Sequence, residues 1–251
     1  STQGYSSAAS DVYKRQKSVR AKVKGTKVKI RLGASSGEWK AMVADEAART
    51  TFAKNIKTVL EKNKLDGIDL DFEWAENEKE YKDYSLAILK MREVLGDKYL
   101  FSVSLHPVCY KISKEAIEAV DFISLQCYGP SPVRFPIEKY CSDIQMVLEY
   151  GIPKEKLVAG VPFYGVTKDN SKKTEAYFNF VQNGLVTSPA QNEVIYQGDT
   201  YVFDGQDNIR IKTRYAKEQK LKGMMSWDLA TDLPLSDSRS LLKTMTEELR
   251  E

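Results

Sequence analysis

From Gly25 onward the chain alternates short strand-like runs with longer helix-like segments, and this alternation limits the folds that it can adopt. Apolar residues that recur at spacings of three and four predict the helices, most clearly from Tyr81 to Leu95. Strands that alternate with helices form a parallel sheet covered by helices. Both an open doubly wound sheet and a closed barrel fit this pattern. The predicted strands lie at residues 28–33, 66–74, 99–105, 121–128, 157–165 and 223–229.

The domain organisation follows from length and local composition. Residues 1–10 are rich in Ser, Ala and Gly and lack periodicity, so we interpret them as a flexible lead that need not be native. Residues 11–251 are then expected to form one domain, because a chain of this length fits a single barrel-sized unit. Within this domain, the polar stretch 166–207 is expected to be a long loop or a small excursion.

Composition excludes several classes of protein. With 42% hydrophobic and 29% charged side chains, the chain is expected to fold around a packed core. The formal charge of +3 comes from scattered Lys and Arg residues, so no nucleic-acid partner is expected. No apolar run approaches the roughly 20 residues that cross a bilayer, so no membrane partner is expected. The chain has too few cysteines for a disulfide scaffold (Cys109, Cys127, Cys141). Its single histidine, His106, excludes a multi-histidine metal site.

The segment 66–74 is the strongest candidate for chemistry. Side chains alternate across a strand, so Asp69, Asp71 and Glu73 share one face while the apolar residues between them share the other. If helices cover the apolar face, the acidic face must line a barrel interior or a cleft. Crowding and burial there raise the pKa of at least one carboxyl group, which suits general acid catalysis. A solvated acidic face conflicts with helix coverage, whereas a divalent-cation site stays open.

Asp66 through Glu73 matches, at every fixed position, the D-G-x-D-x-D-x-E signature of glycoside hydrolase family 18, the chitinase-like enzymes. Three further segments resemble later strands of that family's barrel, in the family's order: Gln126-Cys127-Tyr128, Leu157 to Gly165, and Gly223 to Trp227. The resemblance covers about residues 18–232. It implies an α/β fold of the TIM-type (β/α) barrel class.

The resemblance also implies the reaction and the residues that perform it. Family members hydrolyse β-1,4-linked N-acetylglucosamine polymers such as chitin with retention, using the substrate's acetamide as nucleophile and no metal or organic cofactor. Glu73 would be the general acid and base, and Asp71 would orient the acetamide. Asp69 would share a proton or a hydrogen bond with Asp71. The Tyr128 hydroxyl would donate a hydrogen bond to the acetamide oxygen. Asp66 has the opposite parity on the strand, and a structural role for it is as open as a catalytic one.

Substrate-binding residues follow from the same resemblance. Trp227 would stack under a sugar ring, and Gln126 would line the pocket beside Tyr128. Trp74, Tyr110 and Tyr164 are candidates for outer subsites, although ordinary packing would explain each of them. Two other functions stay open: an endo-β-N-acetylglucosaminidase that acts on N-glycans, and a chitin-binding lectin with weak or no turnover. Family lectins typically lack the catalytic glutamate, whereas Glu73 is present here, which counts against the lectin.

The sequence departs from the family at the third strand. This chain has Arg31-Leu32-Gly33-Ala34 where the family usually has S-x-G-G. A charged side chain therefore takes a position where a small one normally points inward. Too few residues precede this strand to form the family's first strand, first helix and second strand. We therefore expect an incomplete barrel of strands three to eight, with Lys29 and Arg31 protecting an exposed edge. A homodimer could complete such a barrel. The resemblance implies an extracellular location, although the chain shows no leader.

Overall fold

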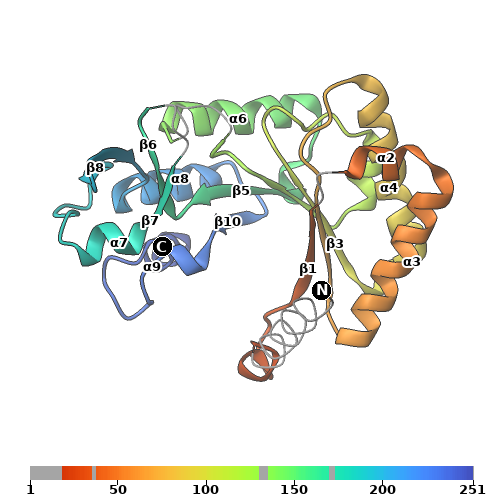
Figure 1. Cartoon of the computed structure of the whole chain (residues 1–251), viewed down its shortest axis with the longest axis horizontal. Coiled ribbons are helices and arrows are strands. Elements are labelled where there is room, and N and C mark those ends of the chain that lie inside the picture. The colour runs from red at the N-terminus through yellow and green to blue at the C-terminus, as the bar shows by residue number, and fades with distance from the viewer. Residues whose placement is uncertain (1–18, 36–37, 130–134, 170–172, 251) are drawn as a thin grey trace, which may run out of the picture.

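The computed structural model describes residues 19–35, 38–129, 135–169 and 173–250, so the predicted lead at 1–10 lies outside the described residues. All six predicted strands are present and pair in parallel in one curled sheet, in the order β1-β2-β3-β4-β5-β10 (Figure 1). The prediction of an incomplete (β/α) barrel is confirmed, because this sheet forms about half of a barrel wall. Its strands are β1 (Arg31–Ser35), β2 (Gly67–Asp71), β3 (Leu100–Leu105), β4 (Phe122–Leu125), β5 (Leu157–Pro162) and β10 (Gly223–Trp227).

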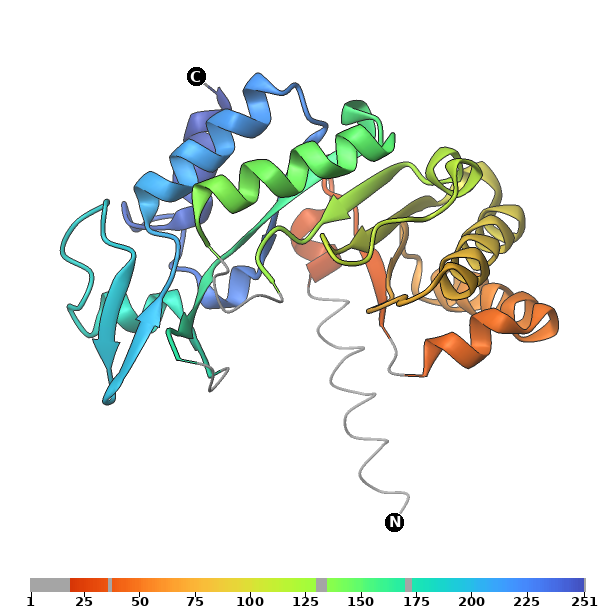
Figure 2. The same cartoon turned by 90° about the horizontal axis from the view of Figure 1, so that it is seen from above.

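The helices that follow the strands pack along the outer side of the curved sheet, as Figure 2 shows for α4, α6, α8 and α9. Residues 19–23 are also helical, and short 3₁₀ helices occupy Gly96–Lys98, Lys154–Lys156 and Leu229–Thr231. Further helices are α2 (Trp39–Ala44), α3 (Glu46–Asn63), α4 (Glu78–Leu95), α5 (Lys114–Ala119), α6 (Ile137–Tyr150), α8 (Gln206–Glu218) and α9 (Leu241–Arg250).

Local sequence signals explain where several helices begin and end. The Asp45 carboxylate accepts a hydrogen bond from the Ala48 amide at 2.7 Å and caps the start of α3. Ser113 caps α5 in the same way. Gly151 ends α6 in the left-handed conformation, with φ of 110°, which a residue without a Cβ adopts at little cost.

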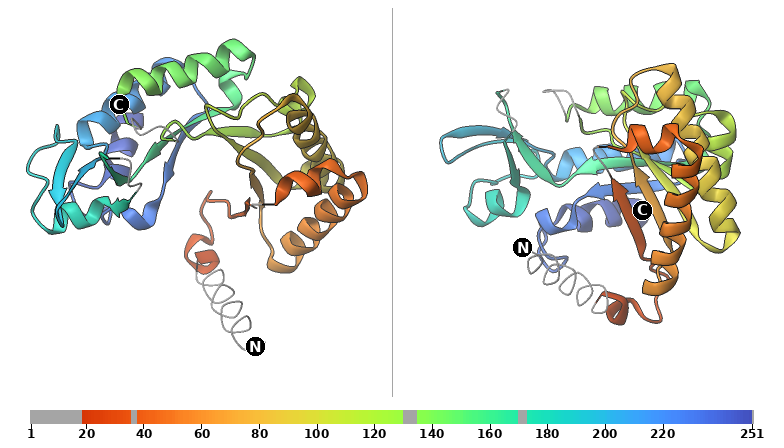
Figure 3. Two further views of the ribbon diagram at one scale, coloured as in Figure 1. Left: turned by 45° about the horizontal axis from the view of Figure 1, so that its top comes forward. Right: turned by 45° about the vertical axis from the view of Figure 1, so that its right-hand side comes forward.

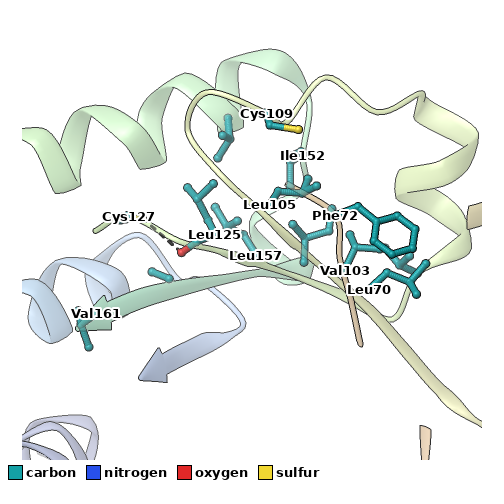
Figure 4. Packing of buried hydrophobic residues seen from close by; sticks show 14 of the residues in the cluster. Leu70, Phe72, Val103, Leu105, Cys109, Leu125, Cys127, Ile152, Leu157 and Val161 are labelled. Atoms are coloured by element: carbon teal, nitrogen blue, oxygen red, sulfur yellow. Dashed lines mark hydrogen bonds between the residues drawn. The ribbon is translucent and has the colours of Figure 1, made fainter. Parts of the chain in front are cut away.

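The core lies between the sheet and its outer helices (Figure 4). Ile68, Leu70 and Phe72, the apolar face of β2 and its extension, are buried there, as the alternation predicts. Trp39 of α2 stacks on Phe72 with ring centroids 5.3 Å apart. Cys127 is also buried, and desolvation raises the pKa of its thiol to about 12. Because the apolar side chains of β2 point into this core, its acidic side chains face the inner side of the sheet.

A second, antiparallel sheet occupies most of the stretch for which the sequence left a loop or an excursion open. Its strands are β6 (Tyr164–Thr167), β7 (Thr174–Ala176), β8 (Glu193–Tyr196) and β9 (Asp199–Val202), in the order β7-β6-β9-β8. Helix α7 (Tyr177–Gln182) follows β7, and its Phe180 packs against Tyr201 and Phe203. This part projects to one side of the parallel sheet (Figure 3). It therefore stands beside the C-terminal ends of β5 and β10.

Candidate active site

A hollow with a volume of about 780 Å³ lies on the inner side of the parallel sheet. It lies at the carboxyl ends of the strands, where barrel enzymes place their active sites. The structure brings all eight predicted site residues to it: Asp69, Asp71, Glu73, Trp74, Gln126, Tyr128, Tyr164 and Trp227. Tyr110 does not line this hollow, and its ring packs edge-on against Tyr150 instead. The remaining aromatic candidates thus gather around the three acids.

Asp69 is held by hydrogen bonds on both carboxylate oxygens. Its Oδ1 accepts from Arg31 Nη1 at 3.2 Å and from the Ser102 hydroxyl, and its Oδ2 accepts from the Ser104 hydroxyl at 2.7 Å. Arg31 comes from β1, whereas both serines come from β3, the strands on either side of β2. Three strands therefore fix the orientation of this carboxylate.

Asp71 and Glu73 share one donor, the side-chain amide of Gln126. Its Nε2 lies 2.8 Å from Asp71 Oδ1 and 3.2 Å from Glu73 Oε1. Burial above all, and then the neighbouring charges of Glu73 and Asp69, raise the pKa of Asp71 to about 6, against the lowering effect of the Gln126 hydrogen bond. The sequence predicted a raised pKa for at least one acid, and Asp71 meets that expectation. Asp71 therefore keeps a proton in mildly acidic solution.

Glu73 is exposed, which differs from the expectation that all three acids share a buried face. The physical reason is its position: β2 ends at Asp71, so Glu73 stands on the rim of a sheet that does not close around it. Its backbone is nevertheless fixed, because Trp39 Nε1 donates to the Glu73 carbonyl at 2.9 Å. Sequence reasoning missed both α2 and this contact. The spacing of four between the buried Trp39 and Val43 was the available signal.

Asp66 does not line the hollow, and the structure gives it a structural contact. Its Oδ2 accepts a hydrogen bond from the backbone amide of Ile30 at 2.7 Å, which ties the segment before β1 to the start of β2. A carboxylate that supports the sheet thus precedes β2, and carboxylates that face the hollow lie at and just after its end.

Tyr128 stands beyond the acids, on the chain that follows β4. Its ring is buried, meets the ring of Tyr164 edge-on at 6.4 Å, and places its hydroxyl 3.8 Å from the Met225 sulfur. Desolvation raises the pKa of Tyr128 far above its usual value, so the hydroxyl stays protonated and can donate. A neutral phenol in this position suits an uncharged acceptor such as an amide oxygen.

Two tryptophans offer ring surfaces to the hollow. Trp227, at the end of β10, has 57% of its surface exposed although it is a large apolar residue. Trp74 directly follows Glu73 and packs against the ring of His106, with centroids 5.3 Å apart. His106 itself is buried, and its Nδ1 accepts a hydrogen bond from the Val108 backbone amide at 3.4 Å. An exposed tryptophan beside a row of acids is typical of sugar-binding sites, since pyranose C–H faces pack on aromatic rings.

Within the described ranges, no group of three or more His, Cys, Asp or Glu side chains is arranged to hold a metal ion. The helices of the same ranges include none with the length and apolar character of a bilayer span.

A half-barrel of parallel strands, with a row of acids at the end of β2 and an exposed tryptophan lining the same hollow, places the chain in the (β/α)-barrel class. The model of the family described as "Glycosyl hydrolases family 18" matches residues 2–232. The chain therefore belongs to the glycosyl hydrolases of family 18, and it is a chitinase-like member.

Curated relatives and solved structures agree with this assignment. The chain is 23% identical over 273 residues to "Probable chitinase 2" of Drosophila melanogaster, covering 82% of this chain and 56% of the relative. It is 23% identical to "Chitinase A1" of Niallia circulans, covering 84% of this chain and 42% of the relative. The chain thus spans about half the length of these curated relatives.

The fold is similar to that of two solved proteins with different descriptions. A chitinase from Bacteroides thetaiotaomicron superposes with a TM-score of 0.83 at 22% identity, covering 94% of this chain and 81% of that one. A chitinase-like agglutinin from Robinia pseudoacacia superposes with a TM-score of 0.78 at 19% identity, covering 97% of this chain and 87% of that one. At these identities the likeness establishes the fold.

Proposed function

We propose that this protein hydrolyses β-1,4 bonds between N-acetylglucosamine units of chitin by retaining, substrate-assisted catalysis. The observation that carries the proposal is the pairing of Asp71 and Glu73 on one Gln126 nitrogen, in a hollow that Trp227 also lines. Such a pair can hold one proton for the leaving group and one negative charge for a cationic intermediate.

The proposed steps use the substrate's own acetamide. Its oxygen bonds to the anomeric carbon while the bond from that carbon to the glycosidic oxygen breaks. The Glu73 proton passes to the departing oxygen. Asp71 accepts a hydrogen bond from the acetamide N–H and stabilises the positive charge of the cyclic intermediate. Water then adds to the anomeric carbon, Glu73 takes a proton from that water, and the bond to the acetamide oxygen breaks. The configuration at the anomeric carbon is retained.

Two aromatic residues would hold the sugar for these steps. Tyr128 would donate its hydroxyl to the acetamide oxygen, and its burial beside Met225 restricts where that hydroxyl can point. Trp227 would stack under the sugar ring with its exposed face. Trp74 and Tyr164, which also line the hollow, would contact neighbouring sugar units.

A lectin function is the second candidate, because two observations favour it. Glu73 lies exposed on the rim of an open sheet, and a solved protein of similar fold is described as a chitinase-like agglutinin. An acid displaced by about 1 Å can lose a factor of about 100 in rate while sugar binding persists. Hydrolysis of N-glycans by the same acids is the third candidate.

Product analysis separates these candidates. The protein is incubated with N-acetylglucosamine hexamer, with fully deacetylated hexamer and with an N-glycoprotein, and the products are identified by mass spectrometry. The proposal predicts cleavage of the acetylated hexamer alone, because the deacetylated one lacks the internal nucleophile. Cleavage of both hexamers contradicts substrate assistance. Release of glycans supports the third candidate, and binding without cleavage supports the lectin.

Location and assembly are proposed on the same basis. A polymer such as chitin is met outside the cell, so we propose an extracellular site of action. Within the described residues, β1 and β10 each pair with one neighbouring strand only, so both present free backbone groups at the sheet edges. Pairing of these edges with a second copy remains a prediction. Light scattering tests it, with a mass near twice 28.5 kDa in support and a monomer at all concentrations against it.

A further inference from the structure

The guanidinium of Arg31 lies inside the hollow, although the sequence suggested that this residue protects a strand edge. Its Nη1 donates to Asp69 Oδ1 at 3.2 Å and to the Ser102 hydroxyl. Its guanidinium carbon lies 4.6 Å from the centre of the Phe122 ring, a distance at which a cation is attracted to the ring face. The side chain is 29% exposed. Arg31 is therefore anchored from β1 across to β4.

This contact network leaves Asp69 with little freedom. Its carboxylate accepts from one guanidinium and two hydroxyl groups, so both oxygens are engaged on the β1 and β3 sides. The hydrogen bond of Asp71, in contrast, comes from Gln126 on the other side of the site. The three acids are thus divided into a fixed, charge-compensated Asp69 and an Asp71–Glu73 pair joined by one amide.

We infer that Arg31 is a positioning residue for the reaction proposed above: it holds the Asp69 carboxylate in place and offsets the negative charge that Asp69 would otherwise exert on Asp71. The inference rests on that proposed function for its catalytic consequence, but its geometric part concerns the carboxylates alone. Arg31 acts through Asp69 and needs no contact with substrate. The positive charge also permits three acids to occupy one strand end without accumulating three uncompensated charges.

The charged and titratable groups around the acids determine the expected effect of removing Arg31. Besides Arg31 and the three acids, the hollow is lined by Lys29 before β1, His106 after β3, Tyr128 after β4 and Tyr164 of β6. Both tyrosines carry no charge when protonated, and Lys29 is exposed to solvent. Without Arg31, the Asp69 charge acts on Asp71 with little compensation. Because a nearby negative charge raises the pKa of a carboxyl group, Asp71 would release its proton at higher pH.

The experiment compares Arg31→Gln, which removes the charge, with Arg31→Lys, which keeps it. Catalysis needs a proton on the Asp71–Glu73 pair, so kcat/KM is expected to fall as pH rises past about 6. In Arg31→Gln the pH at which kcat/KM falls is expected to rise by about 0.5–1 unit. A shift of this size is typical of the loss of one nearby charge that is partly exposed to solvent. Arg31→Lys is expected to stay within about 0.2 unit of the unaltered protein. Lys29→Gln is the control, because it removes the same charge from an exposed neighbouring residue. Its kcat/KM profile is also expected to stay within about 0.2 unit of the unaltered protein.

A second readout separates this inference from the proposed function. Carboxyl carbons labelled with ¹³C report the titration of Asp71 directly by NMR, whether or not the protein hydrolyses anything, and Asp71→Asn assigns the signal. An upward shift in Arg31→Gln alone supports the inference even if no substrate is cleaved. An unchanged Asp71 titration in folded Arg31→Gln overturns it, as does an equal shift in Lys29→Gln. If Arg31→Gln does not fold, the Asp71 titration in Arg31→Lys decides. A displacement of about one pH unit overturns the inference, and a titration that matches the unaltered protein supports it.

Discussion

Asp71 and Glu73 accept hydrogen bonds from the same nitrogen, Nε2 of Gln126, at 2.8 and 3.2 Å. An amide nitrogen with two hydrogens can serve two carboxylates at once, which keeps both oxygens on one side of the hollow. The bridge spans the position of β3 in the sheet, because the acids lie at the end of β2 and the amide follows β4. It thus links the two strand ends on which the proposed chemistry depends.

Replacing Gln126 with leucine tests this bridge. The Gln126 hydrogen bond lowers the pKa of Asp71, so its loss is expected to move the high-pH limb of kcat/KM upward. We also expect kcat to fall by about 10- to 100-fold, since both carboxylates lose their common support. A pH–rate profile measures both effects. Leucine at this position with an unchanged profile would show that the amide does not organise the pair.

Asp71 is expected to reduce stability at neutral pH. Its carboxyl pKa is about 6 in the folded protein and about 3.9 in an unfolded chain, so folding favours the protonated form. The stabilising contribution is complete below about pH 4 and is lost as pH rises through about 6. Asp71→Asn removes the charge, and we expect it to raise the free energy of unfolding at pH 8 by about 1–2 kcal/mol, allowing for solvent screening.

Denaturant unfolding of Asp71→Asn at pH 4 and pH 8 measures this difference. Asp97→Asn, at an exposed position in the 3₁₀ helix after α4, is the matched control, and it should show no such pH dependence. An equal effect of Asp71→Asn at both pH values would contradict the assignment of the raised pKa to Asp71.

Trp227 is expected to contribute to substrate binding and little to the fold, because 57% of its surface is exposed. Trp227→Ala should raise KM for N-acetylglucosamine oligomers by about tenfold or more, and Trp227→Phe should retain part of the affinity. Leu229→Ala, at a similarly exposed apolar side chain two residues on, should change KM less than twofold. Isothermal titration with a chitin oligomer measures the same ranking. Equal effects at both positions would remove the stacking role.

Trp39 is expected to act on catalysis through the backbone of Glu73. Trp39→Phe keeps an aromatic ring against Phe72 but removes the donor to the Glu73 carbonyl. We expect kcat to fall by about tenfold with little change in KM, because a small displacement of the acid affects the chemical step more than binding. Tyr84→Phe alters the same aromatic cluster without touching Glu73 and should retain kcat. A similar fall in both variants would point to a general packing defect.

The sequence was sufficient for the parallel sheet and for the acidic strand end, because both follow from local periodicity. Alternation alone predicts that Leu70 faces the core and Asp71 the hollow, and the structure agrees. Local patterns did not distinguish a long loop from a small excursion at 166–207, although one signal for the antiparallel sheet was present. Gln197 and Gly198 both have positive φ and join β8 to β9 in a two-residue turn between two β-rich runs.

The contacts that shape the site were beyond local patterns, because they join distant parts of the chain. The charge on Arg31 was read as edge protection, whereas its partner Asp69 lies 38 residues away and meets it only when β1 pairs with β2. Trp39 reaches Glu73 across 34 residues. Exposure of Glu73 likewise depends on how the sheet closes, which periodicity within one strand does not report.

The rate of chitin-oligomer cleavage by Glu73→Gln tests the central claim most directly, because glutamine fits the same space and has no acidic proton. The account predicts that cleavage of N-acetylglucosamine hexamer falls by about 100- to 10,000-fold while oligomer binding persists. Glu118→Gln, on the exposed surface of α5, should remain within twofold of the unaltered protein. Glu73→Gln that cleaves the hexamer as fast as Glu118→Gln would contradict the assignment of the acid.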